Sequence, residues 1–154
     1  MSQLADLHGA VSHALSSGRL GTPVFVRYLY HRALNGPAIG VRLVQTVRTV
    51  REWMGRGIER AHALGSLQSR HVTLTVEFRG GATALITWIG LPGRGDGVDL
   101  TVVGNHGSLY HDSGTAELWD EPAQVETIIA DPALAALIDR ALRSGQPESA
   151  GGQP

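Results

Sequence analysis

Residues 71–90, HVTLTVEFRGGATALITWIG, constrain the fold more than any other stretch of the sequence. Apolar and polar residues alternate from His71 to Arg79, and the alternation resumes after Gly80 and Gly81. Successive side chains of a strand point to opposite faces of a sheet, so this period of two predicts two strands with one apolar face each. Paired glycines allow the positive φ angles of a tight turn. The segment therefore predicts a β-hairpin with a two-residue loop.

The remaining sequence predicts helices at both ends of the chain and one between strands. Apolar residues recur at helical spacing in residues 4–15 and 39–54, and Gly18 and Gly55 follow these segments as helix ends. Asp131 can cap a third helix. We expect strands at residues 23–30, 58–64, 71–79, 84–89, 98–102, 108–112 and 116–120. The strands from residue 71 onward are expected to form an antiparallel meander.

These elements indicate an α+β fold rather than a parallel βαβ sheet. With 154 residues the chain is long enough for one hydrophobic core and too short for two ordinary domains. We expect a single domain over residues 1–145, built on a mostly antiparallel open sheet of about five to seven strands with helices on one face. The tail, residues 146–154, is rich in small and polar residues and is expected to be disordered.

The expected sheet carries apolar residues on both faces, although the chain has helices enough to cover only one. The second face should therefore be available for oligomerisation, because large exposed apolar patches mark interfaces. Trp88 can pack either in the core or at a subunit contact. The interface candidates are Phe25, Leu29, Leu85, Ile89 and Trp88.

Composition excludes several classes of function. The formal net charge is −1 and the sequence pI is about 6.6, so no bulk positive field attracts nucleic acid or an anionic membrane surface. The N-terminus MSQLADLHGA lacks the pattern of a signal peptide, and a cytoplasmic location is expected. The chain has no cysteine and all 13 basic residues are arginine. Disulfides, cysteine nucleophiles and lysine-dependent catalysis are thereby excluded.

Two further features could bind ions but have simpler interpretations. His106, His111 and Asp112 flank a predicted turn, yet a spacing of five along a regular strand places the two rings on opposite faces. Solvated side chains are favoured there over a metal site. The Gly-rich residues 90–97, with Arg94, could cradle a phosphate, but phosphate loops normally lead into a helix and this stretch leads into a strand. We expect a hairpin connection and no metal.

Four segments resemble, in order, the C-terminal domain of the Gfo/Idh/MocA oxidoreductases. ALSSGRLGTPVFVRY is similar to the family's helix, Gly-x-Leu/Ile-Gly turn and first sheet strand, and VTLTVEFRGGATALITW to its Phe-x-x-Gly-Ala hairpin. LTVVGNHGSLYHD is similar to its Gly-x-x-Gly-Ser/Thr-Leu element, and LAALIDRALRSGQP to its late helix. We expect Gly104 and Gly107 to supply positive φ angles at a turn. The matched residues, within residues 4–147, are Gly18, Leu20, Gly21, Phe78, Gly81, Ala82, Gly104, Gly107, Ser108 and Leu109.

The resemblance also shows which parts of the family's chemistry are missing. It implies a preceding dinucleotide-binding domain and a catalytic lysine, but the sequence has no Gly-x-Gly-x-x-Gly fingerprint and no lysine. The family's substrate-facing aspartate and histidine fall on Val41 and Gln45, and neither can act as an acid or base. We therefore assign no catalytic or cofactor-binding residue. Val41, Gln45, Arg48 and Tyr30 are the candidates for the substrate cleft.

Three functions follow from this resemblance. The leading hypothesis is a non-catalytic domain that dimerises through its sheet, or that serves a full-length oxidoreductase as an accessory or regulatory subunit. A second is the substrate-binding half of a split sugar or polyol oxidoreductase, which would use NAD(P) only with a separate Rossmann-domain partner. A third is a module that binds a sugar or another small molecule without turnover. In none of them is the isolated chain expected to be an enzyme.

Overall fold

The computed structural model describes residues 3–31, 36–90, 97–112 and 130–151. Arg94 and the strand expected at residues 116–120 lie outside the described residues. The elements are α1 (Gln3–Ser16), β1 (Pro23–His31), α2 (Gly36–Met54), β2 (Ile58–Gly65), β3 (His71–Phe78), β4 (Thr83–Ile89), β5 (Gly97–Gly104), β6 (Ser108–Asp112), α3 (Pro132–Ser144) and β7 (Glu148–Ser149).

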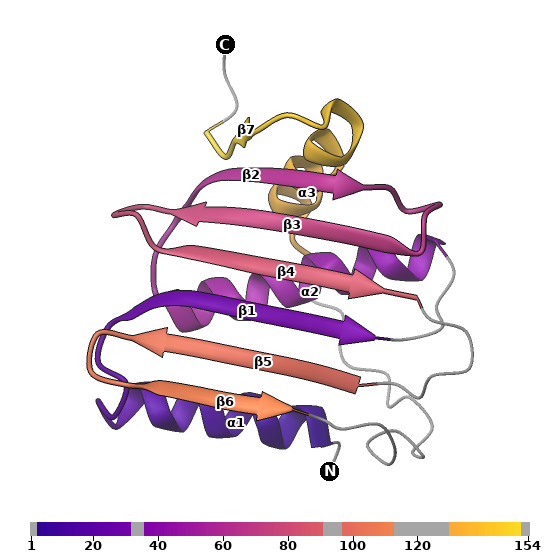
Figure 1. Ribbon diagram of the computed structural model, residues 1–154. Helices are drawn as coiled ribbons and strands as arrows, with labels where there is room; N and C mark the ends of the chain where they lie inside the picture. The colour runs from indigo at the N-terminus through magenta and orange to yellow at the C-terminus, as the bar shows by residue number, and fades with distance from the viewer. Residues whose placement is uncertain (1–2, 32–35, 91–96, 113–129, 152–154) are drawn as a thin grey trace.

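The described strands form one open, mixed sheet in the order β6-β5-β1-β4-β3-β2-β7 (Figure 1). β1 runs parallel to β4, and the other five neighbouring pairs are antiparallel. The predicted α+β class and mostly antiparallel sheet are confirmed. The predicted meander is wrong, because β1 lies between β4 and β5 and pairs with both. Alternation specifies the faces of a strand but not which strand lies beside it.

The hairpin between β3 and β4 is confirmed, with a loop one residue longer than expected. The Phe78 N–H donates to the Ala82 carbonyl over 2.8 Å, which closes a loop of Arg79, Gly80 and Gly81. Both glycines have a φ of +88°. This backbone conformation disfavours any side chain, so the predicted role of the paired glycines holds although the loop length does not.

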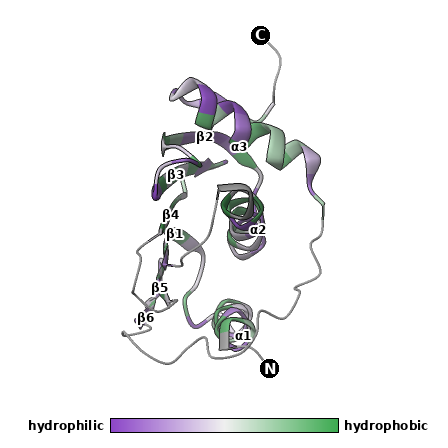
Figure 2. Cartoon of the chain, turned by 90° about the vertical axis from the view of Figure 1, so that its right-hand side faces the viewer, coloured by the Kyte–Doolittle hydropathy of each residue, from purple (hydrophilic) through white to green (hydrophobic). Residues whose placement is uncertain are grey.

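The three helices of the described residues lie on the same side of the sheet (Figure 2). The hydrophobic core fills the space between these helices and the sheet. Its strand residues follow the predicted alternation, as in β3, where every second side chain is buried. The strand residues with at most 1% of their surface exposed include Val26, Val72, Leu74, Val76, Phe78, Ala84, Leu100 and Val102.

The chain continues the sheet beyond Gly145, where the domain was expected to end. Gly145 has a φ of +60° and ends α3, and its N–H donates to the Ala141 carbonyl. β7 then pairs with Arg60 and Ala61 of β2, and the Arg140 guanidinium lies 3.7 Å from the Glu148 carboxylate. Glu148 and Ser149 thus form a short edge strand, because the outer edge of β2 offers them backbone partners.

Two glycine-containing turns, one just before β1 and one just after β5, are joined by hydrogen bonds although they lie far apart in the sequence. The Asn105 N–H donates to the Thr22 carbonyl over 3.0 Å, and the Asn105 side-chain oxygen accepts from the Thr22 N–H over 2.8 Å. Gly21 has a positive φ of +70°, whereas Gly104 and Gly107, for which positive φ angles were predicted, do not have them. Gly104 is required for a different reason, because a Cβ there would overlap the Leu20 carbonyl oxygen.

Asp131 caps α3 as predicted and also joins α3 to α2. Its side chain accepts from the Leu134 N–H over 3.1 Å and lies 2.7 Å from the Arg51 guanidinium. The backbone hydrogen bond, followed by the Arg51 contact, holds the pKa of the Asp131 carboxyl below its usual value despite partial burial. The carboxylate therefore stabilises the fold above its ordinary pKa, and this contribution is lost as the pH falls through the lower pKa of the folded state.

We expect Asp131→Ala to lower the free energy of unfolding by about 1 to 2 kcal/mol at neutral pH, because it removes the cap and leaves Arg51 without its carboxylate. The difference from wild type should shrink towards about pH 3 in urea denaturation. Asp139→Ala is the matched control on the same helix, since Asp139 pairs with the exposed Arg143 one turn later. Equal losses from the two substitutions would contradict this role for Asp131.

Candidate functional site

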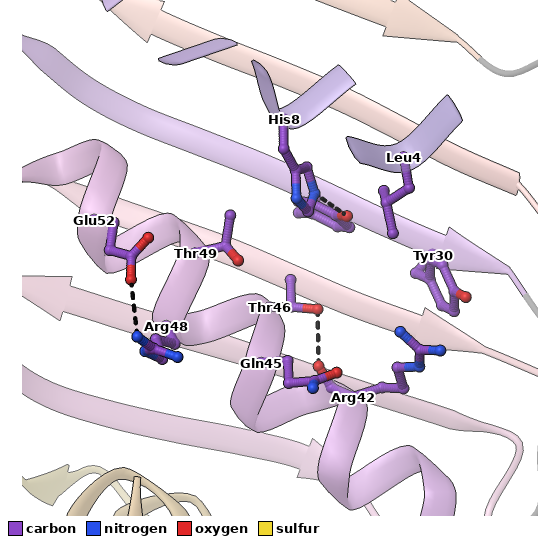
Figure 3. A pocket seen from close by; sticks show the side chains of 10 residues that line it. Leu4, His8, Tyr30, Arg42, Gln45, Thr46, Arg48, Thr49 and Glu52 are labelled. Atoms are coloured by element: carbon purple, nitrogen blue, oxygen red, sulfur yellow. Dashed lines mark hydrogen bonds and ion pairs between the residues drawn. The ribbon is translucent and has the colours of Figure 1, made fainter. Parts of the chain in front are cut away.

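A pocket of about 410 Å³ lies between α1 and α2 on the helix-covered side of β1 (Figure 3). Its volume is within the range of about 300 to 1,000 Å³ that is usual for small-ligand sites. The side chains that line it are Leu4 and His8 from α1, Tyr28 and Tyr30 from β1, and Arg42, Gln45, Thr46, Arg48, Thr49 and Glu52 from α2.

Helical periodicity directs the polar side of α2 into this pocket. Arg42, Gln45, Thr49 and Glu52 follow one another at intervals of three or four residues, so they lie along one stripe of the helix. The alternate stripe, which includes the buried Val47, packs against the sheet. The Thr46 hydroxyl donates to the Arg42 carbonyl over 2.9 Å and is engaged within the helix.

An aromatic cluster joins the three elements that form the pocket. His8 of α1 lies 3.0 Å from the Tyr28 hydroxyl, measured from Nε2. The Trp53 ring packs edge-on against His8 at 5.3 Å and is stacked with Tyr28 at 6.3 Å between ring centroids. Tyr28 and Trp53 are 2% and 7% exposed. The cluster fixes the distance between α1 and α2 and positions His8 at the pocket wall.

The charged groups of the pocket are arranged unevenly. Arg48 pairs with Glu52 one turn later at 3.5 Å, but the Arg48 side chain is 27% exposed and that of Glu52 is 63% exposed. Arg48 is therefore the less exposed member of this ion pair. Arg42 extends towards Tyr30 at the other end (Figure 3). Among the described lining residues, Arg42, Arg48 and Glu52 carry a charge at neutral pH.

The pocket contains three of the four residues that the sequence suggested for a substrate cleft. Tyr30, Gln45 and Arg48 line it, whereas Val41 is 41% exposed and does not. Sequence reasoning missed His8, which comes from the first helix of the chain. The available signal was its place one turn after Leu4, on the inner stripe of that helix.

Four of the five interface candidates share the sheet surface opposite the helices. We call this surface the open face and define it by Phe25, Leu29, Leu85, Ile89, Val103 and Tyr110. The register places these side chains on the face opposite the buried Val26, Tyr28 and Ile86. Trp88 does not belong with them, because it is 2% exposed and lies on the helix-covered side. In the alternating pattern of β4, Trp88 shares the face of Ala84 and Ile86.

The other ion-binding candidates are not brought together. His111 pairs with Leu100 across β5 and β6, and therefore shares the helix-covered face, while Asp112 pairs with Asp99 on the open face. His106 lies in the turn that packs against Gly21. Within the described residues, no group of three or more histidine or acidic side chains is placed to hold a metal. The same part of the chain has no helix long and apolar enough to cross a membrane.

The described residues do not fit a dinucleotide. Such a site requires a glycine-rich turn from a parallel strand into a helix, where backbone N–H groups bind the pyrophosphate. β1 is followed by a helix, but the sequence between them, RALNGPAIG, has no Gly-x-Gly-x-x-Gly spacing. The glycine-rich stretch after β4 leads into β5 rather than a helix.

The chain is an α+β domain whose fold also occurs in several solved dehydrogenase structures. Solved structures with the same fold include a myo-inositol dehydrogenase from Lactobacillus casei in complex with NAD(H) and myo-inositol, with 14% identity and a TM-score of 0.70, which covers 96% of this chain and 60% of that one. An apo scyllo-inositol dehydrogenase from Lactobacillus casei has 16% identity and a TM-score of 0.60, covering 91% and 50%. A myo-inositol 2-dehydrogenase from Lactobacillus plantarum has 13% identity and a TM-score of 0.56, covering 68% and 38%.

The chain thus spans 38% to 60% of the length of these three structures. The predicted resemblance to the C-terminal domain of the Gfo/Idh/MocA oxidoreductases is confirmed at the level of the fold. No protein-family model and no curated protein matches the sequence.

Proposed function

We propose that this chain is a non-catalytic, oxidoreductase-like domain that acts as a dimerising subunit, with two copies meeting through their open faces. The observation that supports the proposal is the one-sided placement of the helices (Figure 2). Helices cover one face of the sheet, while the opposite face carries large apolar side chains at its centre. A surface of this kind gains free energy when a second apolar surface removes it from water.

The apolar side chains of the open face lie on its two central strands, on either side of the exposed Arg27. In the parallel β1–β4 pair, Leu85 lies directly beside Arg27. Phe25 and Leu29, two residues to either side of Arg27, are therefore the diagonal neighbours of Leu85. Ile89 continues the stripe beside His31. Polar groups surround this stripe, as protein interfaces require of their rim. One example is the Arg60–Glu77 ion pair at 2.6 Å, in which Glu77 raises the pKa of Arg60.

The open face comes close to the size that a specific dimer requires. Six inter-strand spacings of about 4.8 Å and strands of about 7 residues give a surface of roughly 29 by 23 Å. This corresponds to about 650 Å² of flat area, and rough side chains add to it. Stable interfaces bury about 800 Å² on each partner. The face therefore approaches the required size without help from other surfaces.

We expect the purified chain to form a dimer of twice 16.3 kDa in light scattering, and Leu85→Arg to convert it to monomer. A charge at the centre of the stripe should weaken the dimer by about 2 kcal/mol or more, roughly 30-fold in Kd. Ala136→Arg adds the same charge at an exposed position on α3 and should leave the dimer intact. A wild-type chain that stays monomeric at about 100 μM would overturn the proposal, because that concentration exceeds the Kd of most specific dimers.

A second candidate function, binding of a small molecule without turnover, is favoured by the pocket between α1 and α2. Its size suits a single sugar-sized ligand, and it combines aromatic rings with convergent polar groups. The solved structures of similar fold include one in complex with myo-inositol. The two functions use opposite sides of the sheet and can be tested separately.

A further inference from the structure

We propose that the two copies of the dimer stack with their strands running in opposite directions, so that Arg27 of each copy binds the partner's Asp99. This inference rests on the proposed dimerisation through the open faces. It adds the residues that determine how one copy is oriented on the other.

Arg27 lies at the middle of the open face. It is the central residue of β1 and its side chain is exposed. In the sheet it lies between Thr101 of β5 and Leu85 of β4 (Figure 1). Within the part of the chain that the structure describes, its guanidinium has no ion-pair partner. A dimer that covers this face must therefore bring a carboxylate to Arg27, because burial of an unpaired charge strongly opposes association.

The carboxylates of the open face lie in the next row of side chains along the strands. The register places Asp99 and Asp112 beside each other, in the row that also contains Leu29. The Asp99 carboxylate lies 3.6 Å from Nε2 of His31, and its side chain is 27% exposed. A carboxylate has about four acceptor positions. Asp99 can therefore keep its contacts within one copy and still accept hydrogen bonds from a second copy.

Two symmetric arrangements keep the strands of stacked sheets aligned, and they place Arg27 differently. Stacked sheets lie about 10 Å apart, with strand directions within about 30°. A two-fold axis along the strands, between β1 and β4, would place Arg27 over the partner's Leu85 and next to the partner's Arg27. An axis across the strands, at the level of Tyr28, would place Arg27 over the partner's Leu29 and next to the partner's Asp99. Charge complementarity favours the second arrangement.

The apolar side chains of the open face favour the same arrangement. With the axis across the strands, Leu85 is a diagonal neighbour of the partner's Leu29, and Phe25 is a diagonal neighbour of the partner's Ile89. Symmetry doubles both contacts. With the axis along the strands, Leu85 would instead cover the partner's Arg27. Charge and apolar contact therefore indicate one orientation independently.

Charge reversal tests the pairing through the oligomeric state in light scattering. Arg27→Asp places two carboxylates at each contact of its homodimer, and Asp99→Arg places two guanidinium groups there. Each variant alone should be monomeric at a concentration where the wild type is dimeric. An equal mixture of the two should recover the dimer, because both contacts of the mixed dimer join opposite charges. Arg143→Asp reverses a charge on α3 and should leave the wild-type dimer unchanged.

The mixture also separates contacts between copies from contacts within one copy. Arg27 and Asp99 of the same copy are diagonal neighbours in the sheet. An ion pair between them would be lost in both variants, and mixing the two chains could not restore it. With both variants folded, a mixture that stays monomeric would therefore overturn the proposed pairing. Thermal melting checks the folding of Asp99→Arg, which loses the contact with His31.

Arg27→Gln gives a second test that does not depend on Asp99→Arg. We expect sedimentation equilibrium to show a Kd raised about tenfold or more, because two ion pairs are lost from each dimer. A lower Kd would show that the arginines face each other, and an unchanged Kd would show that Arg27 has no carboxylate partner. Either result would refute the orientation but leave dimerisation intact. A monomeric wild type would refute both.

Discussion

Gly104→Ala is expected to lower the free energy of unfolding by about 3 kcal/mol, one of the two largest effects of any single substitution considered in this chain. The new Cβ would overlap the Leu20 carbonyl oxygen and lie 2.8 Å from its carbon. Both are backbone atoms, so no side-chain rotation can relieve the overlap. The turn after Gly104 would have to move away from the Leu20 segment, which weakens the 3.0 Å bond from the His106 N–H to the Leu20 carbonyl.

Thermal denaturation measures this effect directly. For a chain of this size, about 3 kcal/mol corresponds to a fall in Tm of roughly 6 to 12 °C. Gly107→Ala is the matched control in the same motif, because a Cβ there would lie 3.4 Å from the nearest atom, the Arg19 carbonyl oxygen. Its cost should be under about 1 kcal/mol. If the two alanine variants melted together, close approach would not be the reason for the glycine at 104.

Trp53→Ala is expected to lower the free energy of unfolding by about 3 to 5 kcal/mol and to disorganise the pocket at the same time. The Trp53 side chain is 7% exposed and contacts both His8 and Tyr28 through its ring. Its removal leaves a large void and takes away the aromatic contact that holds α1 beside α2. The His8–Tyr28 hydrogen bond at 3.0 Å should then lose its fixed geometry.

Urea denaturation gives the stability change, and the NMR signals of the His8 ring report the pocket. Trp53→Phe is the control because it keeps an aromatic ring at the centre of the cluster, and we expect it to cost about 1 to 2 kcal/mol with the His8 environment preserved. An alanine variant as stable as the phenylalanine variant would show that the cluster does not hold the two helices together.

The candidate site was partly predictable from the sequence. Gln45 was placed in the cleft by the resemblance, and Arg48 follows it on the same helix at a spacing that puts both side chains on one face. Val41 was placed in the cleft by the resemblance, but it is exposed on α2 outside the pocket. His8 could not be assigned, since its contact with Tyr28 joins residues 20 positions apart.

The sequence by itself determined which residues are helical, which are extended and which side of each element is apolar. The alternation in residues 71–90 predicted β3, β4 and the glycine turn between them, because side-chain direction along a strand follows from local backbone geometry. The reason for Gly104 was not predictable in this way, since the atom that excludes a Cβ belongs to Leu20, far away in the chain.

Only the tertiary structure determined which strands and helices lie side by side. It inserted β1 between β4 and β5, placed Glu148–Ser149 at the edge of β2 and brought His8 to α2. Periodicity carries no information about which strand or helix comes to lie beside another, because that choice depends on how all the apolar faces are buried together. The open face of the sheet is the result of both: the sequence placed apolar side chains on it, and the helices of the described residues pack on the opposite side.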